Sequence, residues 1–257
     1  MTSFGRVLKL TPAKRPTCAI LLADVGFPSD FMPVSLPSRR LTAELLDSLP
    51  PDSADARHSR ADLRFINRCM GNPDWIVRRL HSLLRPGEAI LELGAGDGTL
   101  LERLRRDPAF AENPLAGLDR IPKPEREGWE KIGWIESDLT GDAVPPRAGV
   151  VVANLVLHHF TREELGRLGA KLAEACRARV LLACEPFRSR VHQWQAATLR
   201  LAGASAITLH DARVSIEAGF RGDELAEALG LPPERWEMAV ERTWLGAYRL
   251  AAVKRGA

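Results

Sequence analysis

Carboxylates and glycines mark the stretch of this chain that is best suited to chemistry. Residues 88–100 read Glu-Ala-Ile-Leu-Glu-Leu-Gly-Ala-Gly-Asp-Gly-Thr-Leu, an apolar run followed by three glycines at alternate positions. The run before Gly94 has strand composition and the leucines after Gly98 have helical spacing, so we expect a strand, a tight turn and a helix. Glycine allows positive φ and close approach by a ligand. The helix that follows presents free N–H groups to that ligand.

The spacing of the glycines separates two classes of ligand. A dinucleotide fingerprint reads Gly-x-Gly-x-x-Gly, with the pyrophosphate at the helix N-terminus. Here the third glycine comes one residue early, at Gly98, and Thr99 takes the dinucleotide position. Asp97 would also place a carboxylate beside a pyrophosphate, which like-charge repulsion disfavours. We therefore expect a ligand that is cationic or neutral at this turn.

The pattern Glu92-x-Gly94-x-Gly96-x-Gly98 resembles the nucleotide-binding motif of class I S-adenosylmethionine (SAM)-dependent methyltransferases. The resemblance extends over about residues 73–254. It implies an α/β fold with a Rossmann-like, seven-stranded, doubly wound sheet, SAM as the cofactor, and methyl transfer as the reaction. The sulfonium and amino groups of SAM suit nearby carboxylates.

Two further carboxylates follow predicted strands. Residues 114–119 read as a second strand that ends on Asp119, 21 positions after Gly98, where a doubly wound fold places an acidic residue near ribose hydroxyls. Residues 134–139 read as a third strand that ends at Asp138, and the resemblance puts this aspartate against the adenine amino group. The alternatives are a strand-end turn for Asp119 and a helix or turn cap for Asp138.

The predicted cofactor-binding residues come from these strand ends and from the end of a fourth strand. They are Glu92, Leu93, Gly94, Ala95, Gly96, Asp97, Gly98, Asp119, Arg120, Asp138, Leu139, Asn154, Leu155 and His159.

Histidines at the same sheet edge are candidate bases. Residues 149–157 form the most continuously apolar strand and run into His158 and His159, after which Thr161 and Glu164 predict a capping box. Histidine titrates near neutral pH, so the candidate catalytic residues are His158, His210 and its neighbour Asp211. If the strand stays extended, His158 and His159 face opposite sides of the sheet. We expect His159 to face the cofactor, His158 to pack or cap, and His210 to accept the proton.

The acceptor is less constrained than the cofactor. Residues 154–157 read Asn-Leu-Val-Leu, which lacks the Asn/Asp-Pro-Pro-Tyr/Phe box of amine methylation on adenine or glutamine. Cys184 reads as a buried strand residue, which disfavours a cysteine nucleophile for cytosine methylation. We expect a small-molecule acceptor methylated at oxygen or carbon. A protein or RNA methyltransferase and a non-catalytic SAM-binding protein remain as alternatives.

The chain divides into three predicted parts. Residues 1–38 hold five prolines and read as a loosely ordered arm, in which Met32 is an alternative start. Residues 39–85 predict a helical cap of three helices, the first of which carries four leucines on one face (Leu41, Leu45, Leu46 and Leu49). Residues 86–257 predict the SAM-binding domain, with an insertion at 188–220 in which Trp194, Ala197 and Leu201 face inward.

Composition excludes several other classes of protein. The 257 residues carry a net charge of +3 with acidic and basic residues interleaved, which does not indicate a nucleic-acid partner. The four cysteines are far apart and form no Cys-x-x-Cys pair, so neither disulfides nor a zinc site is indicated, and no metal is expected. No apolar run approaches the roughly 20 residues of a membrane span. We expect a soluble, cytoplasmic protein.

Overall fold

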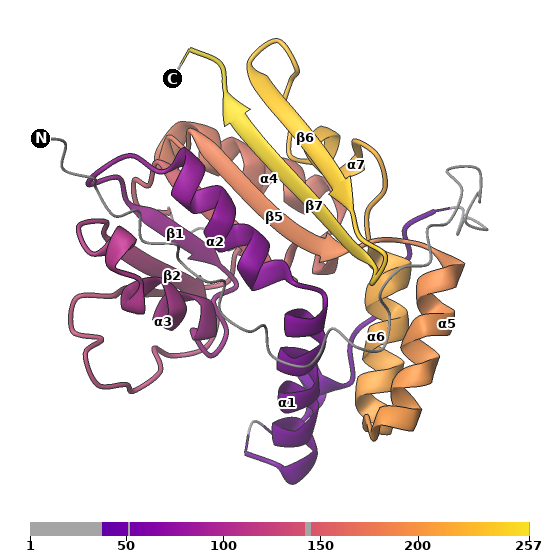
Figure 1. Ribbon diagram of the computed structural model, residues 1–257. Coiled ribbons are helices and arrows are strands. Elements are labelled where there is room, and N and C mark those ends of the chain that lie inside the picture. Colours follow the sequence, from indigo (N-terminus) through magenta and orange to yellow (C-terminus); the bar gives the residue numbers. More distant parts are fainter. Residues whose placement is uncertain (1–37, 51, 142–144, 257) are drawn as a thin grey trace, which may run out of the picture. The chain divides into compact units, whose positions relative to one another are not determined.

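One seven-stranded sheet organises the protein (Figure 1). The computed structural model describes residues 38–50, 52–141 and 145–256. The strand order is β3-β2-β1-β4-β5-β7-β6; β1 to β5 are parallel, and β7 runs antiparallel to β5 and β6. The strands are β1 (Ile90–Leu93), β2 (Leu115–Asp119), β3 (Gly133–Glu136), β4 (Val150–Asn154), β5 (Val180–Pro186), β6 (Trp236–Arg242) and β7 (Ala247–Lys254). The predicted seven-stranded α/β fold is confirmed.

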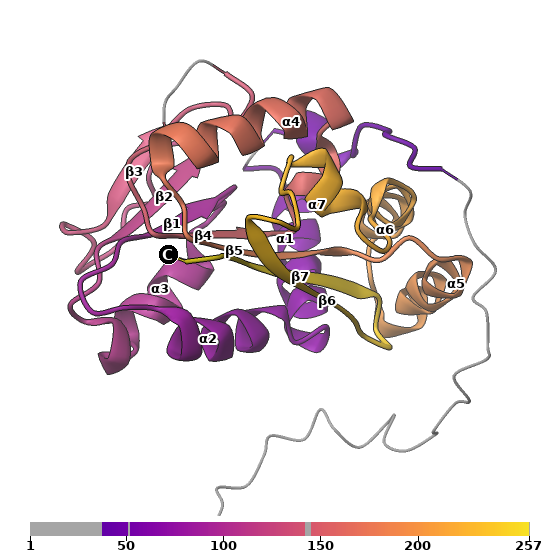
Figure 2. The same ribbon diagram turned by 90° about the horizontal axis from the view of Figure 1, so that it is seen from above.

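Helices cover both faces of the sheet (Figure 2). Helices α2 (Asn72–Leu83) and α3 (Thr99–Arg106) lie on one face, and α4 (Arg162–Lys171) and α7 (Glu224–Ala228) lie on the other. Successive residues of β4 point to opposite faces, so Val150 packs in the core beneath α2 and Val151 packs in the core beneath α4. This two-sided burial explains why the central strands read as continuous apolar runs.

The strand order reverses between β1 and β4. From β1 the chain builds outward through β2 and β3, and it then returns to the other side of β1 with β4. The connections that follow β1 and β4 leave toward opposite faces of the sheet. A crevice forms between them at the carboxyl ends of these strands, and doubly wound folds bind ligands there. The glycine turn begins at this edge, directly after Leu93.

The region before β1 differs from its prediction. Helix α1 (Ala54–Cys69) and α2 match the second and third predicted helices, but no helix begins at Arg39. Residues 39–50 contain only a 3₁₀ turn, η2 (Leu46–Ser48), and Leu41 and Leu45 are exposed. The predicted helix is wrong, and its four leucines share no buried face, since two are exposed and Leu46 and Leu49 are only half-buried. Helix α2 packs on the sheet instead of over the site, and the residues of the predicted arm before Ser38 lie outside the described ones.

The predicted insertion is a pair of helices beside the carboxyl edge of the sheet. Helix α5 (Arg190–Thr198) and the 3₁₀ turn η6 (Leu199–Ala202) precede α6 (Ala206–Ala218), which lies next to α5 (Figures 1 and 2). Trp194 is 79% exposed and Leu201 is 91% exposed, so the prediction that they face inward is wrong. Helix α6 makes the buried contacts, including those of Asp211 and Val214. No helix in the described part of the chain is long and apolar enough to cross a membrane.

Two glycines of α4 provide a test of the packing against α7. A Cβ on Gly169 would lie 1.9 Å from the backbone carbonyl oxygen of Leu229, whereas a Cβ on Gly166 would meet nothing closer than 3.6 Å. We expect Gly169→Ala to destabilise the protein, since overpacking costs about 1–3 kcal/mol. Gly166→Ala is the matched control and should stabilise the protein by up to about 1 kcal/mol through helix propensity. Urea unfolding measures both, and equal effects would contradict this account of the α4–α7 contact.

Candidate active site

The glycine turn after β1 uses its glycines for different purposes. Gly94 and Gly96 both have positive φ, 63° and 54°. A Cβ on Gly94 would lie 2.4 Å from Val156, so this glycine lets the turn after β4 pack directly against the turn after β1. A Cβ on Gly96 would meet nothing within 4 Å, so the backbone here faces open space. Gly96 is therefore the position where a ligand can approach the main chain.

Asp119 lies beside this turn, as predicted. The parallel pairing of β2 with β1 brings the end of β2 next to the glycines. The Oδ2 of Asp119 accepts a hydrogen bond from the backbone N–H of Gly96 at 2.7 Å, and its Oδ1 accepts one from Ile121 at 3.1 Å. Asp119 is half-buried, so it both fixes the turn and offers a negative charge at its rim.

Glu92 is a buried carboxyl group directly beneath the turn. It is 4% exposed, and its Oε2 has no hydrogen-bond partner among the described residues. Burial raises the pKa of Glu92 well above its ordinary value, and the negative charges of Asp97 and Asp119 raise it further. The surroundings of Glu92 therefore favour its neutral form over its ionised form.

Two other predicted carboxylates are engaged in local structure. Asp97 accepts hydrogen bonds from the backbone and hydroxyl of Thr99, and its Oδ2 lies 3.1 Å from a guanidinium nitrogen of Arg64 on α1. Asp138 lies two residues beyond β3 and is exposed. Its Oδ1 accepts from the hydroxyl and backbone of Thr140, and these bonds lower its pKa. The Oδ1 of Asp138 thus stabilises a turn, and its contact with adenine stays a prediction.

The remaining predicted cofactor residues differ in what they can offer. Leu93, Ala95 and Leu139 are buried in the core, so only their backbones are available to a ligand. Arg120 forms an ion pair with Asp47 at 2.6 Å. Asn154 ends β4, and its buried Oδ1 has no partner among the described residues. Leu155 follows with φ 59°, a conformation that a branched residue adopts rarely and that marks strain.

The two adjacent histidines do not lie in a strand. The extended chain ends at Asn154, and His158 and His159 lie in a 3₁₀ turn, η4 (Leu157–His159). Their rings are 4.2 Å apart between centroids and are tilted by 34°. The expectation that they face opposite sides of the sheet is therefore wrong, because the backbone leaves the extended conformation at Leu155. His158 is 4% exposed, whereas His159 is exposed.

Glu185 organises this turn and was missed in the sequence. It ends the apolar part of β5 and is fully buried. Its carboxylate accepts hydrogen bonds from the backbone N–H groups of Val156, Leu157 and His158. Its Oε2 also lies 2.7 Å from the Nδ1 of His158. The one signal in the sequence is an acidic residue directly after the apolar run 180–184.

Residues before α1 complete the site and were also missed. The guanidinium of Arg39 donates hydrogen bonds to the backbone carbonyls of Ala218, His158 and Phe160. The Oε1 of Glu44 lies 3.5 Å from the Nε2 of His158. Burial by itself lowers the pKa of His158, but the nearby carboxylates of Glu185 and Glu44 raise it to about 9. Burial by itself raises the pKa of Glu44, but the nearby ring of His158 helps to lower it to about 2.

The pair on α6 is arranged around Asp211. Asp211 is 1% exposed and accepts hydrogen bonds from the backbone N–H groups of Leu45 at 2.8 Å and Leu46 at 3.0 Å. Its Oδ1 also lies 3.0 Å from the Nδ1 of His210, which is half-buried. With its carboxylate occupied in this way, Asp211 positions other groups and is not itself available as a base.

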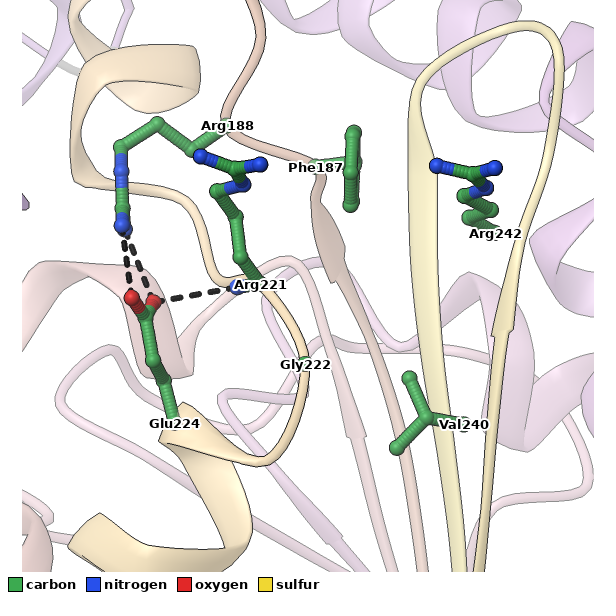
Figure 3. A pocket seen from close by; sticks show the side chains of 7 residues that line it. All are labelled: Phe187, Arg188, Arg221, Gly222, Glu224, Val240 and Arg242. Atoms are coloured by element: carbon green, nitrogen blue, oxygen red, sulfur yellow. Dashed lines mark hydrogen bonds and ion pairs between the residues drawn. The ribbon is translucent and has the colours of Figure 1, made fainter. Parts of the chain in front are cut away.

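A separate hollow of about 590 Å³ opens on the other side of β5 (Figure 3). Phe187, which follows β5, lies at its rim, and Val240 and Arg242 of β6 form one wall. The guanidinium of Arg188 is held by the carboxylate of Glu224 at 2.6 and 2.9 Å. None of the site residues predicted from the sequence lines this hollow.

Comparison with known proteins supports the fold. No protein-family profile and no curated protein matches this sequence. Plantazolicin methyltransferase BamL, solved with a triazolic desmethylPZN analog and SAH, superposes with a TM-score of 0.62 at 10% identity, over 81% of this chain and 92% of that chain. Its counterpart BpumL, solved with the same type of analog and SAH, gives 0.59 at 11% identity, over 81% and 93%.

The pyocyanin biosynthetic protein PhzM gives a TM-score of 0.50 at 17% identity, over 79% of this chain and 59% of that chain. This chain has the class I methyltransferase fold. Glu92, Gly96 and Asp119 lie at the carboxyl ends of β1 and β2, the edge at which doubly wound sheets bind ligands.

The raised pKa of Glu92 predicts a pH-dependent stability. A carboxyl whose pKa is raised in the folded state favours folding while it is protonated and opposes it as it ionises, so stability falls as the pH rises above the ordinary value. Glu92→Gln cannot ionise. We expect the free energy of unfolding of this variant, relative to wild type, to improve as the pH rises above the ordinary pKa of a carboxyl group in urea titrations.

Glu88 is the matched control for Glu92. Burial raises the pKa of Glu88, but hydrogen bonds from Arg179 outweigh that effect and lower it. Glu88→Gln should therefore lose a constant amount of stability from pH 5 to pH 8, and the loss should shrink only below the ordinary pKa of a carboxyl group. A Glu92→Gln difference that does not change with pH would show that Glu92 is ionised in the folded protein.

Proposed function

We propose that this protein is a SAM-dependent methyltransferase that methylates a small-molecule acceptor at oxygen or carbon. One observation carries the proposal. The glycine turn, the buried Glu92 and the strand-end Asp119 lie together at the point where the strand order reverses. In doubly wound folds this point is the ligand crevice.

The chemistry of the turn fits SAM better than a dinucleotide. Glu92 has a buried oxygen without a partner and a raised pKa, so a cationic amino group beside it would satisfy the oxygen and favour its ionised form. The open space at Gly96 admits such a ligand. A pyrophosphate would instead meet the carboxylates of Asp97 and Asp119 at the same turn, which repulsion disfavours.

The residues that would hold SAM follow the strand ends. Glu92 would face its amino-acid end, Asp119 would accept from its ribose hydroxyls, and Asp138 with the backbone of Leu139 would meet the adenine. His159 would border the methionine portion. When bound, SAM supplies an electrophilic methyl group on a sulfonium ion.

The chain's own contribution is positioning and proton removal. Holding an acceptor in line with a reacting group can lower the activation barrier by about 7–11 kcal/mol. Asp211 binds the Nδ1 side of His210, which leaves Nε2 to accept a proton from an acceptor hydroxyl. His158 is buried against Glu185, which suits a role in shaping the turn.

The similar structures support the acceptor class. BamL and BpumL were solved with desmethylPZN analogs and SAH, the demethylated form of SAM, and both have the fold found here. A small or peptide-derived molecule is therefore the acceptor class that we propose. The described cysteines form no disulfide, which supports a cytoplasmic location.

The first test of the function is SAM binding by calorimetry. Asp119→Ala should weaken binding by about 1.5–3 kcal/mol, or roughly 10- to 150-fold, because hydrogen-bond donors of the ligand lose a charged partner. Glu136→Ala is the matched control, since Glu136 is paired with Asp119 in register at the end of β3. Equal affinities of the Asp119 variant and wild type would remove Asp119 from the site. Tight NAD binding without SAM binding would reject the function.

A second test concerns the base. His210→Ala should lower SAH formation in a metabolite extract by about 10²–10⁴-fold while SAM affinity stays unchanged, because a general base acts only in the transition state. His192→Ala on the neighbouring helix α5 is the control and should retain turnover. If His210→Ala turns over normally, the acceptor is deprotonated by another group or reacts at carbon without this base.

A further inference from the structure

Three potential metal ligands from distant parts of the chain meet beside the turn after β4. Glu44 lies before η2, whereas His158 and His159 lie on η4. One ligand atom from each residue lies within 4.8 Å of the other two. Among the described residues, no other group of three His, Cys, Asp or Glu side chains has this geometry. We propose that Glu44, His158 and His159 bind one divalent transition-metal ion.

The distances are close to those of a bound ion. The Oε1 of Glu44 lies 3.5 Å from the Nε2 of His158 and 4.0 Å from the Nε2 of His159. Ligands bonded to zinc at about 2.1 Å in a tetrahedral arrangement are roughly 3.4 Å apart. Small side-chain movements would therefore bring all three atoms onto one ion.

His158 supplies an observation independent of this spacing. Its side chain is 5% exposed and its Nε2 is buried with no hydrogen-bond partner among the described residues, although it points at Glu44. A charge-assisted hydrogen bond to a carboxylate would be about 2.7–2.9 Å long, shorter than the 3.5 Å seen here. The buried nitrogen therefore faces a carboxylate that is too far away for a hydrogen bond. An ion between the two groups would satisfy both.

The surroundings of the cluster resemble those of metal-binding histidines. The Nδ1 of His158 lies 2.7 Å from Glu185, so a carboxylate fixes the ring and directs Nε2 toward the cluster. Glu44 is held in turn by a hydrogen bond from the hydroxyl of Ser215. Both carboxylates are close to the proposed ion and would compensate its charge.

The ligand set also indicates the class of ion. Two imidazoles and one carboxylate suit zinc, iron or another first-row transition metal better than calcium or magnesium. The side chain of His159 is 32% exposed, so one side of the cluster faces outward and leaves a coordination position for water or another oxygen donor. The site does not depend on the proposed methyl transfer.

Calorimetry with Zn²⁺ alone tests the site on the full chain after EDTA treatment and removal of the chelator. We expect wild type to bind one equivalent, and Glu44→Gln and His159→Ala each to weaken binding at least about tenfold. Glu44→Gln keeps an oxygen for Ser215, and both replaced side chains are at the edge of the core, so circular dichroism should confirm that both variants fold. His81→Ala is the control, because His81 pairs with Asp107 on the outer side of α2 and should leave binding unchanged.

Co²⁺ gives a second readout that a purely structural role of the histidines would not produce. Wild type with one equivalent of Co²⁺ should show a visible absorption band that is shifted or lost in His159→Ala and unchanged in His81→Ala. The proposal is overturned if wild type binds no Zn²⁺, or if Glu44→Gln and His159→Ala bind it as tightly as wild type. Either result would leave Glu44 and His158 as an ion pair only.

Discussion

The arrangement of this site depends on the carboxylate of Glu185. Burying a carboxyl group is costly unless hydrogen bonds replace those it makes with water. Here the backbone N–H groups of Val156, Leu157 and His158 and the ring of His158 surround it. The chain after β4 must turn sharply to bring these donors together, and Leu155 adopts its unusual φ at that point. Such strain costs about 1–3 kcal/mol, which the bonds to Glu185 offset.

The turn after β4 also determines the position of the glycine turn after β1. Val156, whose N–H is held by Glu185, occupies the space that a side chain on Gly94 would need. The ends of β1, β4 and β5 are therefore interlocked through one carboxylate, one valine and one glycine. Asp119 closes the arrangement from the end of β2 through the N–H of Gly96. The open space at Gly96 thus lies next to strand ends that these contacts hold to one another.

The sequence predicted those parts of the site that depend on neighbouring residues. The glycine turn, the strand that ends on Asp119 and the capping box of Thr161 and Glu164 were all confirmed, because each has a local signal of spacing and residue type. Helical spacing at Leu41 and Leu45 was misleading, since a helix also needs a surface on which to pack its apolar face.

The contacts between distant segments could not be read in this way. Nothing near Glu44 indicates that it meets His158, and nothing near Arg39 indicates that it binds the carbonyls after β4. The positions of the histidines depended on whether the strand continued past Asn154. The chain turns there because the buried carboxylate of Glu185, on another strand, needs hydrogen-bond donors from the backbone after Asn154.

Helix α6 links these distant segments into one unit. Asp211 holds the backbone of Leu45 and Leu46, next to Glu44, and Ser215 one turn later holds the carboxylate of Glu44 itself. Thr208, one turn earlier, binds Asp62 of α1 at 2.8 Å. The insertion that carries the proposed base therefore also positions the segment before α1. Through these bonds α6 sets the position of Glu44, which lies 3.5 Å from the Nε2 of His158.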